Sequence, residues 1–441
     1  MSAMTRLLTI MGSGETAPTM VKMHRAVVDR LGPPPVHGVL LDTPFGFQMN
    51  ADELVARAVT YFHDSVGFEM EAAGMRSAAD LGGPGGDAVL ARLAAAPLIF
   101  AGPGSPTYAL RNWASTLVPS MLAEKLTHGG ALTFASAAAL TLGVVTVPVY
   151  EIYKVGDDPH WEEGLDLLTD LGLHVAVIPH YDNAEGGTHD TRFCYLGEQR
   201  LRMLEPMLPD GAFVLGVDEH TALFLDFETD TAWVSGRGVV TVRAQGRSTT
   251  LESGAEFPIS RLPAMAEELR SGWSPEPATV SSATTAAADA DADAEAPSTT
   301  APRPPAADGG GSPLLEAIRS FEAQFRTAKA ERDVPTMRDA ALSLEAEMWA
   351  WRADTLQSDE FDRGRAALRA MVTDLAELAE EGARDPAETI GPFVALALGL
   401  REKARQEGRF EDADWVREQL AEHGIEVRDT PQGPTWVFED R

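Results

Sequence analysis

The sequence has little of what several classes of protein require. Its 441 residues include a single cysteine, Cys194, which excludes an intrachain disulfide framework and a cysteine-based zinc site. No apolar run approaches the roughly 18 residues that a membrane-spanning helix needs. The N-terminal segment is too short in its apolar part for a signal peptide and lacks a cleavage site. We therefore expect a cytoplasmic protein with no membrane association.

Basic residues are scarce as well. The 36 lysines and arginines are outnumbered by 67 aspartates and glutamates, so the formal net charge is −31. A surface this acidic repels phosphate backbones over most of its area. Nucleic acid is therefore a disfavoured partner, except where a local basic patch exists.

Large apolar side chains are rare in residues 271–312, which consist mainly of Ala, Thr, Ser, Pro, Asp and Gly. Such a segment cannot bury enough apolar area to offset the entropy lost on ordering its backbone. We predict a disordered linker there, between an N-terminal part, residues 1–270, and a C-terminal part, residues 313–441.

The N-terminal part alternates short apolar runs with amphipathic stretches, a rhythm typical of a parallel sheet covered by helices. It predicts an α/β three-layer sandwich with a mostly parallel sheet. The C-terminal part has helical periodicity almost throughout, which predicts a small all-α domain, and only Glu426–Phe438 could form a hairpin. The predicted strands of the N-terminal part are Arg6–Met11, Gly38–Leu41, Leu98–Ala101, Ala131–Ala135, Val175–Pro179 and Phe213–Val217.

The stretch Leu132–Leu140 places the hydroxyl of Ser136 between an apolar strand and small residues that could open a helix. A nucleophile elbow has this form, because the serine then stands clear of the sheet and the next N–H points at a developing oxyanion. The elbow pattern is G-x-S-x-G, whereas this chain has Phe134 and Ala138 at the glycine positions. The alternative is a small-residue turn inside a packed core.

The loops after the predicted strands carry further polar residues, and ligands of α/β sheets bind at this edge. Gly12–Thr16 and Gly102–Pro106 are glycine-rich turns that either hold an anion on backbone N–H groups or simply connect strand to helix. His180 ends an apolar strand, where it is placed to serve as general base for a serine at the end of the neighbouring strand. His189 and Asp190 follow in the same loop and either contact substrate or satisfy loop backbone groups.

A histidine base needs a carboxylate to orient it. Asp157 and Asp158 lie in an evident turn between Ser136 and His180, with Glu151 shortly before them, although Asp-Asp-Pro is also ordinary turn chemistry. Glu219, at the end of the last strand, is another acidic candidate. A metal site built from His180, Asp182, His189 and Asp190 is a minority interpretation, because the four cluster on one loop with no further ligand spacing.

These loops together resemble the dipeptidase E and cyanophycinase family of serine hydrolases, over about residues 5–260. The resemblance implies a class I glutamine amidotransferase-like fold, with Ser136 as nucleophile, His180 as base and the third triad member near Asp157 or Asp158. It also implies an oxyanion hole and substrate-binding groups. The chain departs from the family at Phe134 and Ala138, and a phenylalanine there could fill the pocket or reshape the elbow. The residues in the oxyanion and substrate positions are Gly102, Gly104, Ala137, Glu15, His189 and Glu219.

The end of the chain resembles the C-terminal module of cysteinyl-tRNA synthetases, from Leu400–Arg405 through Phe410–Leu420 to Gly424–Trp436. This resemblance implies contact with tRNA. None of the synthetase's catalytic signatures occurs, so aminoacylation is not implied. Arginines at helical spacing share a face and could contact a phosphate backbone, the alternative being a solvated face with Glu–Arg pairs. The basic residues concerned are Arg401, Lys403, Arg405, Arg409 and Arg417.

We thus expect a serine hydrolase that cleaves an amide or peptide bond in a small peptide through an acyl-enzyme, without metal or cofactor. The alternative is a catalytically degenerate protein that acts as a binding or regulatory module. In that case the C-terminal domain contacts tRNA or a protein partner. The sequence leaves the oligomeric state open.

Overall fold

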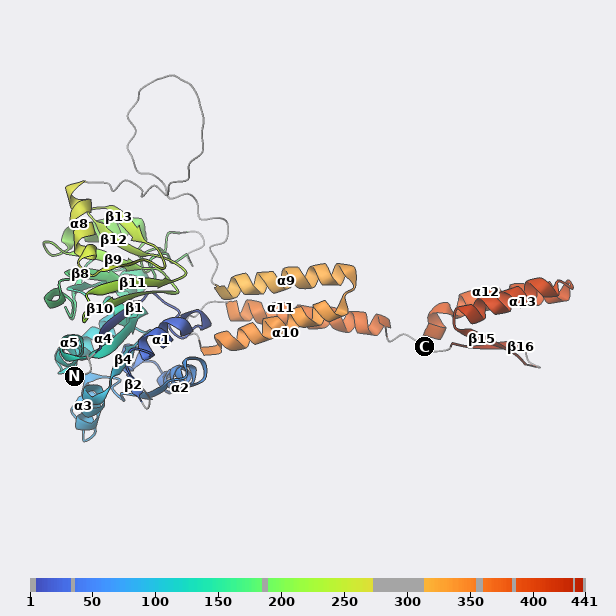
Figure 1. Cartoon of the computed structure of the whole chain (residues 1–441), viewed down its shortest axis with the longest axis horizontal. Helices are drawn as coiled ribbons and strands as arrows, with labels where there is room; N and C mark the ends of the chain where they lie inside the picture. Colours follow the sequence, from blue (N-terminus) through green and yellow to red (C-terminus); the bar gives the residue numbers. More distant parts are fainter. Residues whose placement is uncertain are drawn as a thin grey trace, which may run out of the picture. The chain divides into compact units, whose positions relative to one another are not determined.

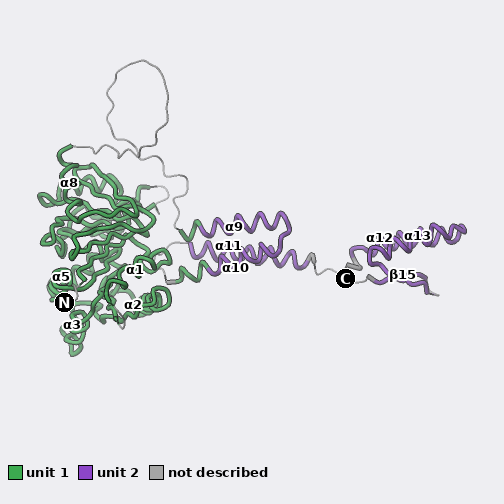
Figure 2. The backbone as a smooth tube through the Cα atoms, viewed as in Figure 1, with its two compact units in different colours: residues 1–316, 347–359 green, residues 317–346, 360–441 purple. Residues whose placement is uncertain are grey.

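The computed structural model describes residues 5–32, 36–184, 189–272, 313–353, 360–382, 386–430 and 433–438. The chain divides into two compact units (Figure 2), one formed by Met1–Glu316 with Glu347–Asp359 and the other by Ala317–Ala346 with Glu360–Arg441. Nearly all of the linker predicted at 271–312 lies outside the described residues. The first unit therefore includes a short segment from beyond the linker.

The first unit is built on a large sheet with the strand order β14-β11-β10-β1-β5-β4-β2-β3. Figure 1 labels β11, β10, β1, β4 and β2 of this sheet. Strands β1, β5, β4, β2 and β3 run parallel, and β10, β11 and β14 extend the sheet in antiparallel fashion. The strands are β1 (Arg6–Met11), β2 (His37–Leu40), β3 (Glu69–Ala72), β4 (Leu98–Ala101), β5 (Gly130–Ala135), β10 (Thr221–Asp226), β11 (Thr231–Gly236) and β14 (Glu256–Pro258).

Both faces of this sheet are buried because its central strands are continuous apolar runs. In β1, Leu8 and Ile10 belong to one core cluster, and Leu7 and Met11 belong to the other. Helices α3 (Gly86–Ala95), α4 (Pro106–Trp113) and α5 (Val118–His128) supply side chains to the first cluster. Helices α1 (Val21–Val28) and α2 (Ala51–Tyr61) supply side chains to the second. The predicted mostly parallel sheet with flanking helices is confirmed.

A second, four-stranded sheet has the order β13-β12-β9-β8, and its strands are β8 (Val175–Ile178), β9 (Phe213–Val217), β12 (Val240–Ala244) and β13 (Arg247–Leu251). The expected pairing of the strand before His180 with the sheet that carries Ser136 is therefore wrong. The apolar residues of β8, β9 and β12 pack into the same core cluster as β5, so the two sheets share one core. Shorter elements complete the unit: α6 (Ser136–Leu140), β6 (Val145–Thr146), β7 (Glu162–Glu163), α7 (Gly197–Leu204) and α8 (Arg261–Ser271).

The C-terminal region is helical, as predicted, and ends in a hairpin. Its elements are α9 (Pro313–Glu331), α10 (Val334–Ala350), α11 (Glu360–Gly382), α12 (Pro386–Gln406), α13 (Phe410–Glu422), β15 (Ile425–Thr430) and β16 (Gly433–Phe438). The hairpin packs on α12 through a small core that contains Val394, Leu398, Ile425 and Val427. Among the described helices of the chain, none is both long and apolar enough to cross a membrane.

Candidate active site

The elbow expected at Ser136 is present in its backbone geometry. β5 ends at Ala135, α6 begins at Ser136, and Ser136 itself has a φ of +50°, in the left-handed region that side chains rarely occupy. The N–H of Ala138 donates to the carbonyl of Gly102 over 3.2 Å, which ties the start of α6 to the loop after β4. Because such strain persists only where surrounding structure imposes it, this turn is held by its packing rather than by glycines.

Phe134 does not line the cavity, so the expectation that it could fill the pocket is wrong. Successive side chains of a strand point to opposite faces, and Phe134 points into the core, where it is fully buried. Its ring packs against Trp113, with 6.2 Å between ring centroids. The bulky residue at the first glycine position is thus part of the core and does not belong to the site.

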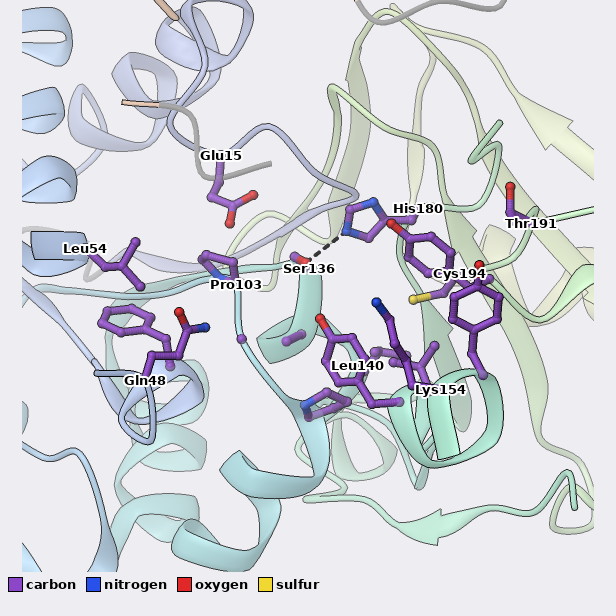
Figure 3. Close-up of a pocket in the computed structure, with 18 of the residues that line it drawn as sticks. Glu15, Gln48, Leu54, Pro103, Ser136, Leu140, Lys154, His180, Thr191 and Cys194 are labelled. Carbon is purple, nitrogen blue, oxygen red and sulfur yellow. Dashed lines mark hydrogen bonds between the residues drawn. The ribbon is translucent and has the colours of Figure 1, made fainter. Parts of the chain in front are cut away.

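His180 follows β8 and reaches across to the edge of the larger sheet. Its backbone N–H donates to the carbonyl of Gly12, after β1, over 3.2 Å, and its φ of +47° is again left-handed. Its Nε2 lies 2.9 Å from the hydroxyl of Ser136 (Figure 3). This is the separation expected of a nucleophile and its base.

The other ring nitrogen of His180 faces a carboxylate. Nδ1 lies 2.7 Å from Oε1 of Glu219, which follows β9. The side chain of Asn183 donates to the same oxygen over 3.2 Å, and the backbone N–H of Glu219 donates to Asp182 over 2.7 Å. Burial raises the pKa of Glu219, but the hydrogen bonds from His180 and Asn183 outweigh it, so the pKa lies below its ordinary value. Glu219 is therefore an anion beside the imidazole.

The structure does not bring Asp157 or Asp158 to His180. Both are exposed and follow a π-helical turn, Glu151–Val155. The carbonyl of Asp158 lies 2.9 Å from Nδ1 of His160, so the hydrogen bonding of this segment is local to its own turn. The carboxylate that faces His180 comes from Glu219, which the sequence offered only as a further acidic candidate.

His189 lies at the rim of the site, where its ring stacks on Tyr153 and its Nε2 lies 3.2 Å from the tyrosine hydroxyl. Asp190 pairs with Arg192 over 2.8 Å, and this hydrogen bond lowers the pKa of Asp190 strongly. Asp190 therefore serves the loop itself. Among the described residues, no group of three or more His, Cys, Asp or Glu side chains is arranged to hold a metal ion.

Two backbone segments beside Ser136 could hold an oxyanion. Ala137, which follows the serine, and Gly104, in the turn after β4, both line the cavity next to the hydroxyl. Gly104 has a φ of +141°, and a Cβ there would lie 2.0 Å from the carbonyl oxygen of Pro44, so the turn requires glycine. The carbonyl of Gly102, two residues before Gly104, accepts the hydrogen bond from the N–H of Ala138.

The cavity in front of Ser136 has a volume of about 500 Å³ and is lined by an acidic residue, Glu15, and a basic residue, Lys154. The Glu15 side chain is 2% exposed, and its Oε1 has no hydrogen-bond partner among the described residues. Burial raises the pKa of Glu15. Figure 3 shows Glu15 and Lys154 on different sides of Ser136, both directed into the cavity.

Several residues that line the cavity were not identified from the sequence. Tyr150, Tyr153 and Lys154 come from the π-helical turn and its flank, and Gln48 comes from the loop after β2. The segment with Tyr150, Tyr153 and Lys154 does not follow a parallel strand, and the loop after β2 has no glycine-rich turn. The patterns used in the sequence analysis therefore did not identify these residues. A search of the long segment between α6 and β8 for aromatic and basic side chains would have found the first three.

The basic residues of the C-terminal module are largely paired. Arg401 is buried and makes two bonds to Asp429, of 2.7 and 2.8 Å, which Arg405 also contacts at 3.2 Å. Arg409 pairs with two neighbouring acids, Glu407 and Asp412. Within the described part of the chain, Lys403 and Arg417 are exposed and form no ion pair. The basic face is therefore smaller than the arginine spacing suggests.

Comparison with protein families matches residues 397–436 to the cysteinyl-tRNA ligase anticodon binding domain. The cysteine–tRNA ligase of Thermus thermophilus is 45% identical over 47 residues, 11% of this chain and 10% of that protein. That of Streptomyces coelicolor is 32% identical over 134 residues, 30% of this chain and 19% of that protein. The chain thus spans no more than about a fifth of the length of these relatives, and the likeness concerns its C-terminal module.

Among solved structures, the chain is similar to a peptidase from an acI-B1 actinobacterium, with a TM-score of 0.48 and 22% identity, covering 58% of this chain and 98% of that one. It is also similar to a putative peptidase E protein from Listeria monocytogenes, with a TM-score of 0.36 and 12% identity, covering 53% and 100%. The structural neighbours of the chain are peptidase E-like proteins.

Proposed function

We propose that residues 1–270 form a serine hydrolase that cleaves an amide or peptide bond of a small peptide through an acyl-enzyme. The observation that carries this proposal is the continuous series of hydrogen-bond distances from Ser136 through His180 to Glu219, 2.9 Å and 2.7 Å long. Nucleophile, base and orienting carboxylate are recognised by such geometry and not by their order in the chain. The assignment of the acid to Glu219 replaces the expected Asp157 or Asp158.

In the proposed reaction, the Oγ of Ser136 attacks the carbonyl carbon while its proton passes to Nε2 of His180. The imidazolium that forms is stabilised by Glu219 at Nδ1. The tetrahedral oxyanion accepts hydrogen bonds from the N–H groups of Ala137 and Gly104. His180 then protonates the leaving amine, and a water, deprotonated by His180, hydrolyses the ester.

The cavity supports a small, polar substrate. A volume of about 500 Å³ admits a few residues of peptide. The carboxyl of Glu15 and the ammonium of Lys154 would face groups of opposite charge on the substrate, such as the two ends of a short peptide. A lone cysteine favours the cytoplasm as the compartment of this chemistry.

A fluorophosphonate probe tests the proposal, because it labels serines activated by a base. We expect labelling of the wild-type chain that is lost in Ser136→Ala and strongly reduced in His180→Ala. His160→Ala, which removes a part-exposed histidine of the segment after the π-helical turn, is the matched control and should label normally. No labelling of the wild-type chain would favour the alternative, a binding or regulatory protein that has lost catalysis.

A second function, contact with tRNA by the C-terminal part, residues 313–441, is favoured by the family match at residues 397–436. Phosphate contacts release counterions, so binding must weaken as salt rises. Filter binding of the full chain to tRNA across salt tests this. We expect a negative salt slope that becomes shallower in Lys403→Ala and Arg417→Ala. A flat response would reject phosphate-mediated contact.

A further inference from the structure

The loop that carries Glu219 is covered by a residue from the far side of the linker. Trp351 belongs to the segment Glu347–Asp359 that is part of the first compact unit. Its ring meets the ring of His220, the residue after Glu219, edge to face, with 5.6 Å between centroids and 76° between planes. Trp351 is 2% exposed and His220 is 4% exposed, so the contact is buried.

His220 is fixed from several sides. Its φ of +50° is left-handed, its Nδ1 lies 3.0 Å from the hydroxyl of Thr19, and its carbonyl accepts the N–H of Arg237 over 3.1 Å. A Cβ on Gly14 would lie 2.2 Å from the ring, so the loop after β1 also fits closely against it. Burial lowers the pKa of His220 to about 4, so the ring is neutral and packs as a polar aromatic group.

Further contacts near Trp351 hold residues from beyond the linker to the rest of the first unit. The indole N–H of Trp351 donates to Glu347 over 2.8 Å, which sets the orientation of the ring. Arg352 pairs with Asp64 at 3.3 Å, and Glu316, at the start of α9, pairs with Arg237 at 2.8 Å. Arg237 is the residue whose N–H binds the carbonyl of His220. The ion pair of Glu316 and the ring contact of Trp351 therefore both act on the loop that contains His220.

We propose that Trp351 is a positioning residue for the site: it holds the loop at His220 so that Glu219 stays aligned with His180. The inference rests on the proposed hydrolase function. It adds that the segment after the linker completes the first unit, because the triad acid is held partly from outside residues 1–270. His220 and Glu219 are adjacent in the chain, so a displacement of the backbone at His220 also displaces the backbone that carries the Glu219 carboxylate.

The test is the rate of fluorophosphonate labelling of the full chain as a function of pH, in Trp351→Ala, Trp351→Leu and Trp351→Phe. A misplaced carboxylate favours imidazolium less, so we expect a lower maximal rate and a half-maximal pH displaced downward. The rate should fall about tenfold in Trp351→Ala, the scale of a buried aromatic contact. Trp351→Phe should restore most of the rate and the normal pH profile, and Trp351→Leu should fall between them.

Trp349→Ala is the matched control, because Trp349 lies two residues away, is 62% exposed and packs its ring against Arg352. It should label like the wild type. Circular dichroism identifies the folded variants, and Trp351→Leu against Trp351→Phe decides the outcome if Trp351→Ala does not fold. The proposal is overturned if the folded Trp351 variants keep the wild-type rate and profile. A wild-type chain that does not label at all refutes the hydrolase function instead.

Discussion

The charge on Glu219 offers the sharpest quantitative test of the proposed hydrolase. Glu219→Gln keeps the size and shape of the side chain. Because the amide of Asn183 donates to the same oxygen that faces His180, the new amide should keep its oxygen toward Nδ1. The imidazole then retains its tautomer, with the proton on Nδ1, and only the negative charge is removed.

The magnitude follows from the 2.7 Å contact. When His180 becomes imidazolium, opposite charges at this distance attract by about 6 kcal/mol at an effective dielectric constant of about 20, which is a ceiling. The difference between hydrogen bonds to charged and neutral groups, about 1–2 kcal/mol, is a floor. We expect the barrier to rise by about 2–4 kcal/mol, a loss of about 30- to 1,000-fold in rate.

The assay is the second-order rate constant of fluorophosphonate labelling at a pH where His180 is neutral. Glu163→Gln, which neutralises an exposed carboxylate in β7, serves as the control. Glu219→Ala removes the acceptor as well as the charge, so it should lose more than Glu219→Gln. A Glu219→Gln protein that labels within about threefold of wild type would refute the assignment of Glu219 as the orienting acid, because such a loss lies below the floor of the estimate.

Three further substitutions test the surroundings of the site. Burial raises the pKa of Glu15 above its ordinary 4.5, so the folded wild type loses stability as the pH rises above about 4.5, and Glu15→Gln should gain in thermal stability over wild type between pH 4.5 and 7. Gly104→Ala should slow labelling at least tenfold, because its Cβ would lie 2.0 Å from the Pro44 carbonyl oxygen and must displace the turn; unchanged labelling would remove Gly104 from the oxyanion hole. Phe134→Ala should cost about 3–5 kcal/mol in denaturant unfolding, yet the protein that remains folded should label at the wild-type rate, since Phe134 lies in the core.

Several buried strands of the first unit were predictable from the sequence, although β10, which is also buried, is not among the predicted strands. The bounds of three strands agree with the prediction: Arg6–Met11, Leu98–Ala101 and Phe213–Val217. Each is a continuous apolar run, which can be recognised in the sequence without knowing which strands lie beside it. β3, Glu69–Ala72, was missed because it is an edge strand with glutamates at alternate positions and one buried side chain, that of Met70. Which sheet β8 joins was not predictable, since periodicity identifies a strand but not its partner.

The site was predictable to the extent that it depends on strand ends. Ser136 and His180 were singled out because each follows an apolar run, and the structure places them within hydrogen-bond distance. The acid facing His180 depends on how the loop after β9 folds back, with the N–H of Glu219 on Asp182. The spacing of Asp157, Asp158 and Glu219 along the chain does not predict that contact.

The departures from the glycine pattern at the elbow bear on whether the site is inactive. Glycine is used at such a turn because it tolerates a left-handed backbone and a close approach between backbone segments. In this chain both features are present without the two glycines. Ser136 adopts the left-handed conformation itself, and Ala138 is close enough to bond the carbonyl of Gly102. Phe134 occupies core space that a glycine would leave to other side chains. The missing glycines therefore alter how the turn is stabilised, and the choice between hydrolase and binder depends on the alignment of Ser136, His180 and Glu219.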